Sequence, residues 1–391
     1  MTRGTWFALI AAFVAGQAGA QTSLSGSIAG ELRYFPQSPA FAGQSDEPLQ
    51  FSTSFEARIS HDLENGNNRI VVSPFLRFGG DGRDHVDLRE AFWLHQRDGW
   101  SLTVGIDKVF WGVTESRHLV NIINQDDALE DIDGEDKLGQ PMVSLSFYGD
   151  FGALSVYVLP WFREREFLDF GDRLAGPLPI GPATYDSPDA RSHVDYALRW
   201  SHSVGSVDVG LSYFNGTSRE PRMIATGPTL VPHYDQISQA GLDLQLTTGD
   251  WLWKLEAIRR NGHGPGFWAA TGGFEWTTPG FAGTGADLGL IAEYSHDGRD
   301  PTLAPATLYD DDLFLGARLA LNDISDTNLL AGALLDRDTD ARVFLIEGQR
   351  RLGDDWLLSL EGRFFDGATG SDPILAIQND DFLSISLKRS F

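Results

Sequence analysis

The densest group of potential metal ligands is the segment from Asp126 to Asp136, in which seven of eleven residues carry a carboxylate. Carboxylate oxygens are ligands that Ca²⁺ prefers. The spacing differs from that of an EF-hand, because Gly134 stands too early and no glutamate closes a twelve-residue loop. The pattern therefore favours a solvated acidic loop, with loop-bound Ca²⁺ as the alternative. A second acidic run at 310–312 presents the same two interpretations.

Histidine is the other residue type that could carry out chemistry. The chain has nine His and no Cys, and no His accompanies a recognisable Ser or Cys nucleophile motif. His118 could form an acid–base group with Glu115 and Asp126, but this spacing is not specific to any reaction. We therefore predict a protein that is not an enzyme, with no catalytic residue, no cofactor and no dedicated metal centre.

The elements that must position these residues are strands. Leu288, Leu290 and Tyr294 lie on one parity of their segment, and Asp287 and Glu293 lie on the other. A period of two indicates a strand with one apolar and one polar face. The same alternation recurs at 51–60, 194–201, 207–213, 242–247, 251–257 and 356–364.

The connections between these segments alternate in length. Short Gly, Asn and Asp turns, such as 64–67, 97–100 and 248–250, predict hairpins. Longer polar connections are expected at 36–48, 79–84, 112–140, 163–189, 215–233, 260–266, 297–308 and 367–379. Strands are expected to begin near 22, 49, 67, 85, 100, 141, 152, 190, 206, 234, 251, 267, 286, 309, 327, 341, 355 and 381.

This rhythm predicts an all-β fold, a transmembrane antiparallel up-and-down β-barrel of about 18 strands, with 16 as the alternative. A soluble propeller is the competing architecture, but no repeat of blade length is present. Aromatic residues are expected at the lipid boundary. Trp100, Trp251, Trp356 and Phe391 would mark one rim, and Trp111 and Trp161 the other.

The N-terminal residues have the pattern of a secretory signal peptide. Arg3 precedes an apolar run at 6–14, and the small residues 18–20 predict cleavage after Ala20. We expect residues 1–20 to be removed and residues 21–391 to form one barrel domain. The net charge of −25 makes nucleic acid a poor partner.

At the C-terminus, Leu383, Ile385 and Leu387 alternate with Ser and Lys before the final Phe391, with Arg389 as the one departure. This segment resembles the closing strand of Gram-negative outer-membrane β-barrel proteins. The resemblance implies a location in the outer membrane, contact with its lipid, and recognition of the terminal strand by the barrel-assembly machinery.

A second segment, 104–112, resembles the Gly-Arg-Gln…Trp/Tyr-Gly stretch of porin-like barrels, with Asp107 and Lys108 in place of the Arg-Gln pair. The connection that follows, 112–140, comes after the fifth expected strand. In trimeric porins the loop at this place folds inward and narrows the pore, so the resemblance implies a constriction loop and a potential homotrimer. Apolar residues at 119–123 also need a surface to bury against.

In such a barrel the polar parity faces a water-filled lumen. The pore-lining or constriction candidates are Glu56, Arg58, Arg77, Asp107, Glu115, Arg117, Asp126, Asp127, Glu130, Asp131, Asp133, Asp195, Arg199, Asp243, Lys254, Glu256, Glu361 and Arg363. The alternative is that many of them pair with neighbours and only hold the wall.

The function that follows is passive diffusion of small hydrophilic solutes, with cations or neutral solutes favoured by the excess of carboxylates. A channel specific for an oligosaccharide or a hydrophobic compound is one alternative. A non-conducting barrel that anchors a partner is the other.

Overall fold

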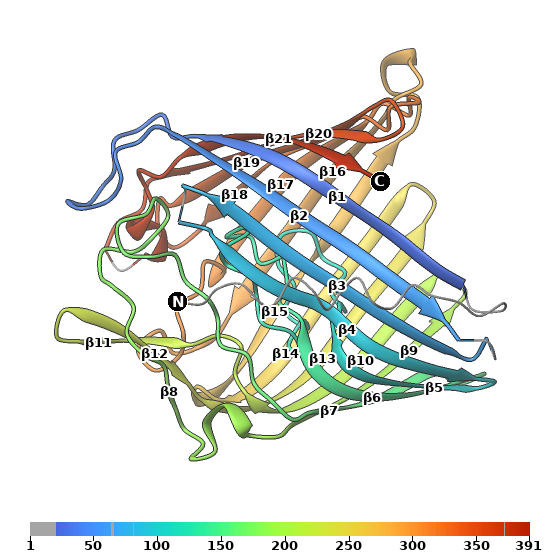
Figure 1. Ribbon diagram of the computed structural model, residues 1–391. Coiled ribbons are helices and arrows are strands. Elements are labelled where there is room, and N and C mark those ends of the chain that lie inside the picture. Colours follow the sequence, from blue (N-terminus) through green and yellow to red (C-terminus); the bar gives the residue numbers. More distant parts are fainter. Residues whose placement is uncertain (1–20, 64–65, 81, 371) are drawn as a thin grey trace, which may run out of the picture.

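The computed structural model describes residues 21–63, 66–80, 82–370 and 372–391. The predicted signal peptide, residues 1–20, lies outside this part of the chain. Eighteen strands form one antiparallel sheet that closes on itself (Figure 1), so the prediction of an 18-stranded barrel is confirmed. None of the described helices is long and apolar enough to cross a membrane.

The barrel strands follow one another in chain order. They are β1 (Gln21–Tyr34), β2 (Leu49–Asp62), β3 (Asn68–Gly79), β4 (His85–Arg97), β5 (Trp100–Asp107), β6 (Gln140–Gly149), β7 (Gly152–Leu159), β9 (Asp195–Val204), β10 (Val207–Thr217), β13 (Gln236–Thr248), β14 (Trp251–Gly262), β15 (Gly264–Thr278), β16 (Asp287–Asp297), β17 (Asp311–Ala320), β18 (Asn328–Asp336), β19 (Arg342–Leu352), β20 (Trp356–Asp366) and β21 (Phe382–Ser390).

The first and last strands close the barrel. β1 pairs with β21 in register from Ser27 opposite Ser390 to Tyr34 opposite Leu383. The backbone of Phe391 continues this ladder, since its N–H donates to the carbonyl of Gly26 (2.9 Å) and its carbonyl accepts from the Gly26 N–H (3.1 Å). A Cβ on Gly26 would lie 2.7 Å from the Phe391 ring, so only glycine leaves room for the ring.

The strands place their apolar parity on the outer face. Leu24, Ile28 and Leu32 of β1 are between 45% and 62% exposed, as are many large apolar residues around the barrel. Such a surface is stable in hydrocarbon and costly in water. Trp251 and Trp253 stack on this face with ring centroids 5.5 Å apart, as rings at a lipid boundary do.

Short turns gather at one end of the barrel and long connections at the other, to the right and left of Figure 1. The long connections carry a small sheet of β8 (Thr184–Tyr185), β11 (Arg222–Thr226) and β12 (Thr229–Tyr234). The predicted connection at 260–266 is wrong. β14 continues to Gly262 and β15 starts at Gly264, because a register shift near Gly262 accommodates the bend.

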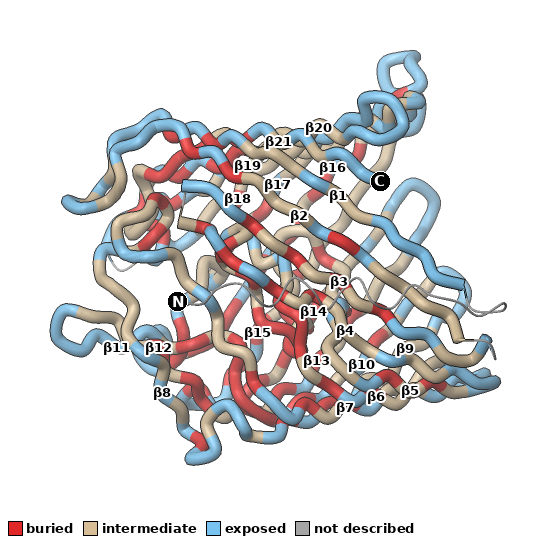
Figure 2. The backbone as a smooth tube through the Cα atoms, in the orientation of Figure 1, coloured by how far each residue is buried: buried red, intermediate tan, exposed pale blue. Residues whose placement is uncertain are grey.

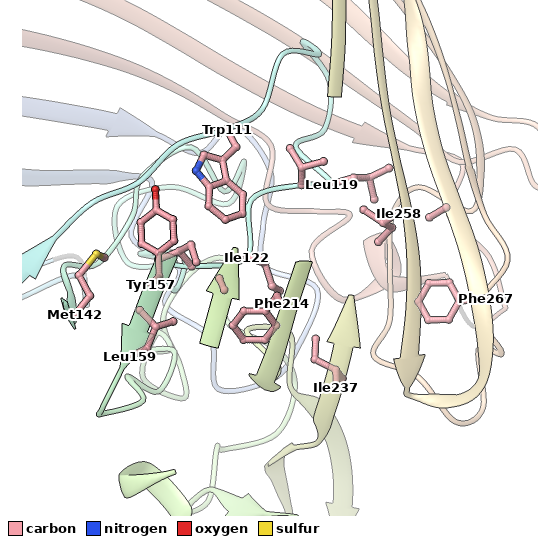
Figure 3. Close-up of a cluster of buried hydrophobic side chains, with 14 residues drawn as sticks. Trp111, Leu119, Ile122, Met142, Tyr157, Leu159, Phe214, Ile237, Ile258 and Phe267 are labelled. Carbon is pink, nitrogen blue, oxygen red and sulfur yellow. The ribbon is translucent and has the colours of Figure 1, made fainter. Parts of the chain in front are cut away.

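The connection between β5 and β6, residues 108–139, lies inside the barrel, and we call it the inner loop. Buried residues are concentrated where it packs (Figure 2). Leu119 and Ile122 pack with Phe214 and Ile258 of the wall (Figure 3). The prediction that Trp111 lies at the lipid rim is wrong, because this residue opens the inner loop and is 7% exposed inside the barrel.

Candidate pore and its inner loop

The tip of the inner loop is bound by a wall carboxylate on β14. Oε1 of Glu256 accepts hydrogen bonds from the Val113 N–H (2.6 Å), the Thr114 N–H (3.1 Å) and the Thr114 hydroxyl (2.8 Å). Its Oε2 accepts from the Val120 N–H (3.0 Å). Four hydrogen-bond donors surround this fully buried carboxylate, and the His118 ring nitrogen Nδ1 lies 3.7 Å from it.

A second wall carboxylate, on β16, binds the next residues of the tip. Glu293 accepts from the Glu115 N–H (2.8 Å), the Ser116 N–H (2.8 Å) and the Ser116 hydroxyl (2.7 Å). On the same strand, Asp297 pairs with Arg117 at 2.7 Å. The inner loop starts at β5 and reaches β16, eight strands farther along the barrel order, so it crosses the lumen.

The acidic half of the inner loop contacts two other parts of the wall, β3 and β20. Glu130 forms a bidentate pair with Arg77 of β3 (2.6 and 2.7 Å), and Asp133 lies 3.2 Å from Arg363 of β20. The seven carboxylates of 126–136 therefore do not act as one group, because several of them bind different basic side chains.

The remaining loop candidates have local partners. Asp126 pairs with Lys137 and with Arg165 (2.6 Å). Asp127 pairs with Arg89 (2.8 Å). Asp131 lies beside Glu361 on the boundary of one cavity described below. The candidate Asp107 ends β5 and accepts from the Lys108 N–H (2.8 Å).

Several wall candidates form ion pairs with other side chains of the barrel. Arg199 of β9 and Asp243 of β13 make two hydrogen bonds of 2.7 and 2.8 Å. The pair spans Gly210 of β10, where a Cβ would lie 2.3 Å from the carboxylate. Two further candidates are also paired, Asp195 with Arg219 of the connection after β10 (2.7 Å) and Arg58 of β2 with Glu90 of β4.

Lys254 and Glu56 complete the wall set. Lys254 lies 3.6 Å from Glu115 of the loop tip, which also binds Arg318 of β17 at 2.7 Å. Glu56 faces a cavity of about 280 Å³ that Lys108 and Lys388 also line. The structure thus brings loop and wall candidates together mainly as ion pairs, and it spreads them over most of the circumference.

His118 lies at the loop tip, but its acidic neighbours differ from those considered on sequence spacing. Its Nε2 is 2.5 Å from Glu135, and its Nδ1 is 3.7 Å from Glu256, so Glu115 and Asp126 are not its partners. Burial alone would lower the pKa of His118, but the hydrogen bond to Glu135 and the Glu256 carboxylate raise it to about 9. The imidazolium therefore lies between two carboxylates at neutral pH.

Three adjoining cavities remain beside the inner loop, along β16 to β20. The outer cavity, about 430 Å³, lies at the long-connection end between 296–312 and 336–341. The central cavity, about 470 Å³, shares Leu308, Leu334 and Val343 with it. The inner cavity, about 380 Å³, shares six lining residues with the central one, among them Glu115, Arg318 and Arg363 and extends toward the short-turn end. The shared lining residues show that the three cavities adjoin one another, and we call the series the path.

The central cavity was missed by sequence reasoning, which placed only polar side chains in the lumen. Its lining includes Phe314, Leu330, Leu334, Val343, Leu345 and Phe365 from β17 to β20. β17 to β19 are apolar on both parities, as in Leu313, Phe314 and Leu315, so alternation could not assign their faces. That continuous apolar run was the available signal, since it is typical of a strand covered on both sides.

Potential metal ligands converge at another place. Among the described residues, three carboxylate or imidazole ligand atoms lie within 4.8 Å of one another in the group Asp186, His233 and Asp235, at the small loop sheet. Asp235 is already held by Arg222 through hydrogen bonds of 2.5 and 2.7 Å. A guanidinium therefore balances the charge of one of the two carboxylates of this group.

Comparison with known proteins shows the fold. No protein-family model and no curated protein matches the chain. It is similar to Wzi, an outer-membrane carbohydrate-binding β-barrel involved in group 1 capsule assembly in Escherichia coli (TM-score 0.55, 10% identity, 94% of this chain and 84% of that chain). It is also similar to a BenF-like porin from Pseudomonas fluorescens Pf-5 (TM-score 0.55, 11% identity, 95% and 98%).

A mutant of Rh. blastica porin aligns with 95% of this chain and 100% of its own at 12% identity, with a TM-score of 0.46. At these identities the likeness concerns architecture. The closed 18-stranded sheet, its apolar outer face and these neighbours together give the chain the fold of porin-type β-barrels of the outer membrane.

Proposed function

We propose that the protein is a channel for passive diffusion of small hydrophilic solutes across the outer membrane, favouring cations or neutral solutes. The observation that supports this function most directly is the series of three adjoining cavities that the docked inner loop leaves beside β16 to β20. Water that fills such a path provides the route for solutes.

The charge of the path supports the preference for cations. Seven carboxylates and one arginine line the outer cavity: Asp297, Asp310, Asp311, Asp312, Asp336, Asp338, Asp372 and Arg299. The boundary between the central and inner cavities has three carboxylates and two arginines. A negative potential at the entrance raises the local concentration of cations and lowers that of anions.

The test is a planar-bilayer recording of the purified, refolded protein in a KCl gradient. We expect stepwise conductance and a reversal potential of the sign that K⁺ selectivity gives. A reversal potential of the opposite sign would reject the preference for cations. Folded protein that inserts and does not conduct would reject the channel and favour an anchoring barrel.

A substrate-specific channel is the second candidate, and the apolar lining of the central cavity favours it. A passage for hydrophilic solutes alone would not need this lining. Recognition of the terminal strand by the barrel-assembly machinery, and assembly into a homotrimer, stay predictions.

A further inference from the structure

Asp312 is a buried carboxylate in the wall of the outer cavity, two residues before Phe314 of the central cavity. It is 2% exposed and lines the outer cavity from β17. Its Oδ2 accepts no hydrogen bond from the part of the chain that the structure describes. A buried carboxylate oxygen without a donor is costly, so a group that supplies positive charge or a donor there would be stabilised.

The protein's own bases near Asp312 have other partners. Arg117 and Arg299 both bind Asp297 at 2.7 Å. Arg337 binds Asp311 at 2.9 Å. The basic side chains around this entrance thus have carboxylates of their own, while Asp312 has no ion pair among the described residues.

The residue opposite Asp312 adds a second carboxylate. Asp336 of β18 stands across from it in the β17–β18 register and lines the same cavity. Asp336 accepts from the Asp338 N–H (2.7 Å), the Thr339 N–H (2.9 Å) and the Thr339 hydroxyl (2.6 Å). Those bonds orient Asp336 but bring no positive charge, so the two carboxylates together favour a cation.

The apolar part of the path begins next to Asp312, on the side of the central cavity. Phe314 follows Asp312 by two residues on the same inward parity, and Leu334 and Val343 line both the outer and the central cavity. Tyr309 and Phe365 add aromatic surface to the central cavity. Apolar side chains that border water are less stable than buried ones, and an apolar ligand would cover them.

From this arrangement we infer that the path contains a binding site for small organic cations, with the ammonium group at Asp312 and an apolar or aromatic body against Phe314, Leu334 and Val343. The inference rests on the proposed channel function and names its solute class. An ammonium satisfies the free oxygen of Asp312, and the central cavity of about 470 Å³ has room for a body of one aromatic ring.

The experiment measures block of K⁺ current through the refolded full-length channel by three probes that separate the charge from the ring. Phenethylammonium carries both features of the proposed ligand, ethylammonium lacks the ring, and phenylacetate has the ring with the opposite charge. We expect the half-blocking concentration of phenethylammonium to be the lowest, about tenfold or more below that of ethylammonium. The reason is that a ring buries much more apolar surface than one methylene group. Phenylacetate should block least.

Two substitutions locate the site, with a matched control. Asp312→Asn should raise the half-blocking concentration of phenethylammonium about tenfold or more, since it removes a buried charge that the ligand pairs with. The control, Asp338→Asn, removes one carboxylate from the exposed rim of the outer cavity and should change the half-blocking concentration less than threefold. Val343→Thr keeps the volume, adds a hydroxyl and should weaken phenethylammonium but not ethylammonium.

Folding of each variant is checked by its heat-modifiable mobility on a gel. A wild-type barrel that does not conduct would overturn the channel itself. A channel that conducts but discriminates neither ring nor charge would overturn only the organic-cation site. Equal block of wild type and Asp312→Asn would also overturn the site. Block by phenylacetate at the lowest concentration would show that the site prefers anions and would overturn the inference as well.

Discussion

Docking of the inner loop should depend on the Glu256 carboxylate, which Glu256→Gln tests with no change in side-chain length. A glutamine can keep one oxygen at the position that serves Val113 and Thr114, but its NH₂ group then faces the Val120 N–H. One buried donor loses its acceptor, at about 1–3 kcal/mol, and the remaining bonds fall from charge-assisted to neutral strength. The free energy that holds the tip in its docked position should therefore decrease by about 3 kcal/mol or more.

The chain has no cysteine, so a single reporter thiol can follow the tip. Val120 is fully buried in the docked loop, and Val120→Cys should react slowly with a water-soluble maleimide. Adding Glu256→Gln should accelerate labelling by about 100-fold, which is what about 3 kcal/mol of opening free energy gives. Glu275→Gln makes the same chemical change on β15 and is the control, because Glu275 makes no hydrogen bond to the inner loop in the part of the chain that the structure describes.

The reasoning would be refuted if the labelling rate of Val120→Cys with Glu256→Gln stayed within threefold of that with Glu275→Gln. Equally fast labelling in the parent would show instead that the tip is already undocked in solution. Single-channel records give a second reading, because a loosened tip beside the central cavity should increase current flicker.

Three further outcomes are expected. Because the pKa of His118 is raised, its ion pairs with Glu135 and Glu256 stabilise the docked loop fully below about pH 6.5, and this stabilisation is lost as the pH rises through about 9. The thermal midpoint of the wild type should therefore fall over this pH range, and that of His118→Gln should fall less. Gly210→Ala should displace the Arg199–Asp243 pair and lower the thermal midpoint by several degrees, whereas Gly30→Ala, whose Cβ would meet Phe51 at 3.6 Å, should be tolerated. Deleting Phe391 removes its backbone pairing with Gly26 and its ring contact with Phe55 (ring centroids 6.4 Å apart), so the yield of heat-modifiable folded barrel on refolding should drop. The control is Ile324→Ser, which should leave the yield unchanged because Ile324 is fully exposed in a turn.

The strand number and the closing pair could be predicted because a period of two assigns each side chain to a face. Ile385 and Leu387 face outward from β21 while Ser384 is buried, as their parity requires. Arg389, on the apolar parity, lies over the Trp356 ring at 5.6 Å, so its charge has an aromatic partner near the rim.

The docking of the inner loop could not be predicted in the same way. Glu256 and Val113 are 143 residues apart, and no local pattern indicates that one binds the other. Sequence reasoning expected an inward loop from its apolar residues, but it could not identify Glu293 or Asp297 as the groups that hold it. The apolar face of the central cavity was missed because β17 to β19 have apolar residues on both parities.

The attachment of residues 113–117 to β14 and β16 also has a mechanical consequence. A wide, hollow cylinder flattens easily into an ellipse, and lateral pressure from the surrounding bilayer would change its bore. The inner loop continues from β5 and is bound to β14 and β16, six and eight strands farther along the barrel, so it holds these two sides of the wall at a fixed spacing. Bilayers of different thickness should therefore tilt this cylinder without altering its single-channel current.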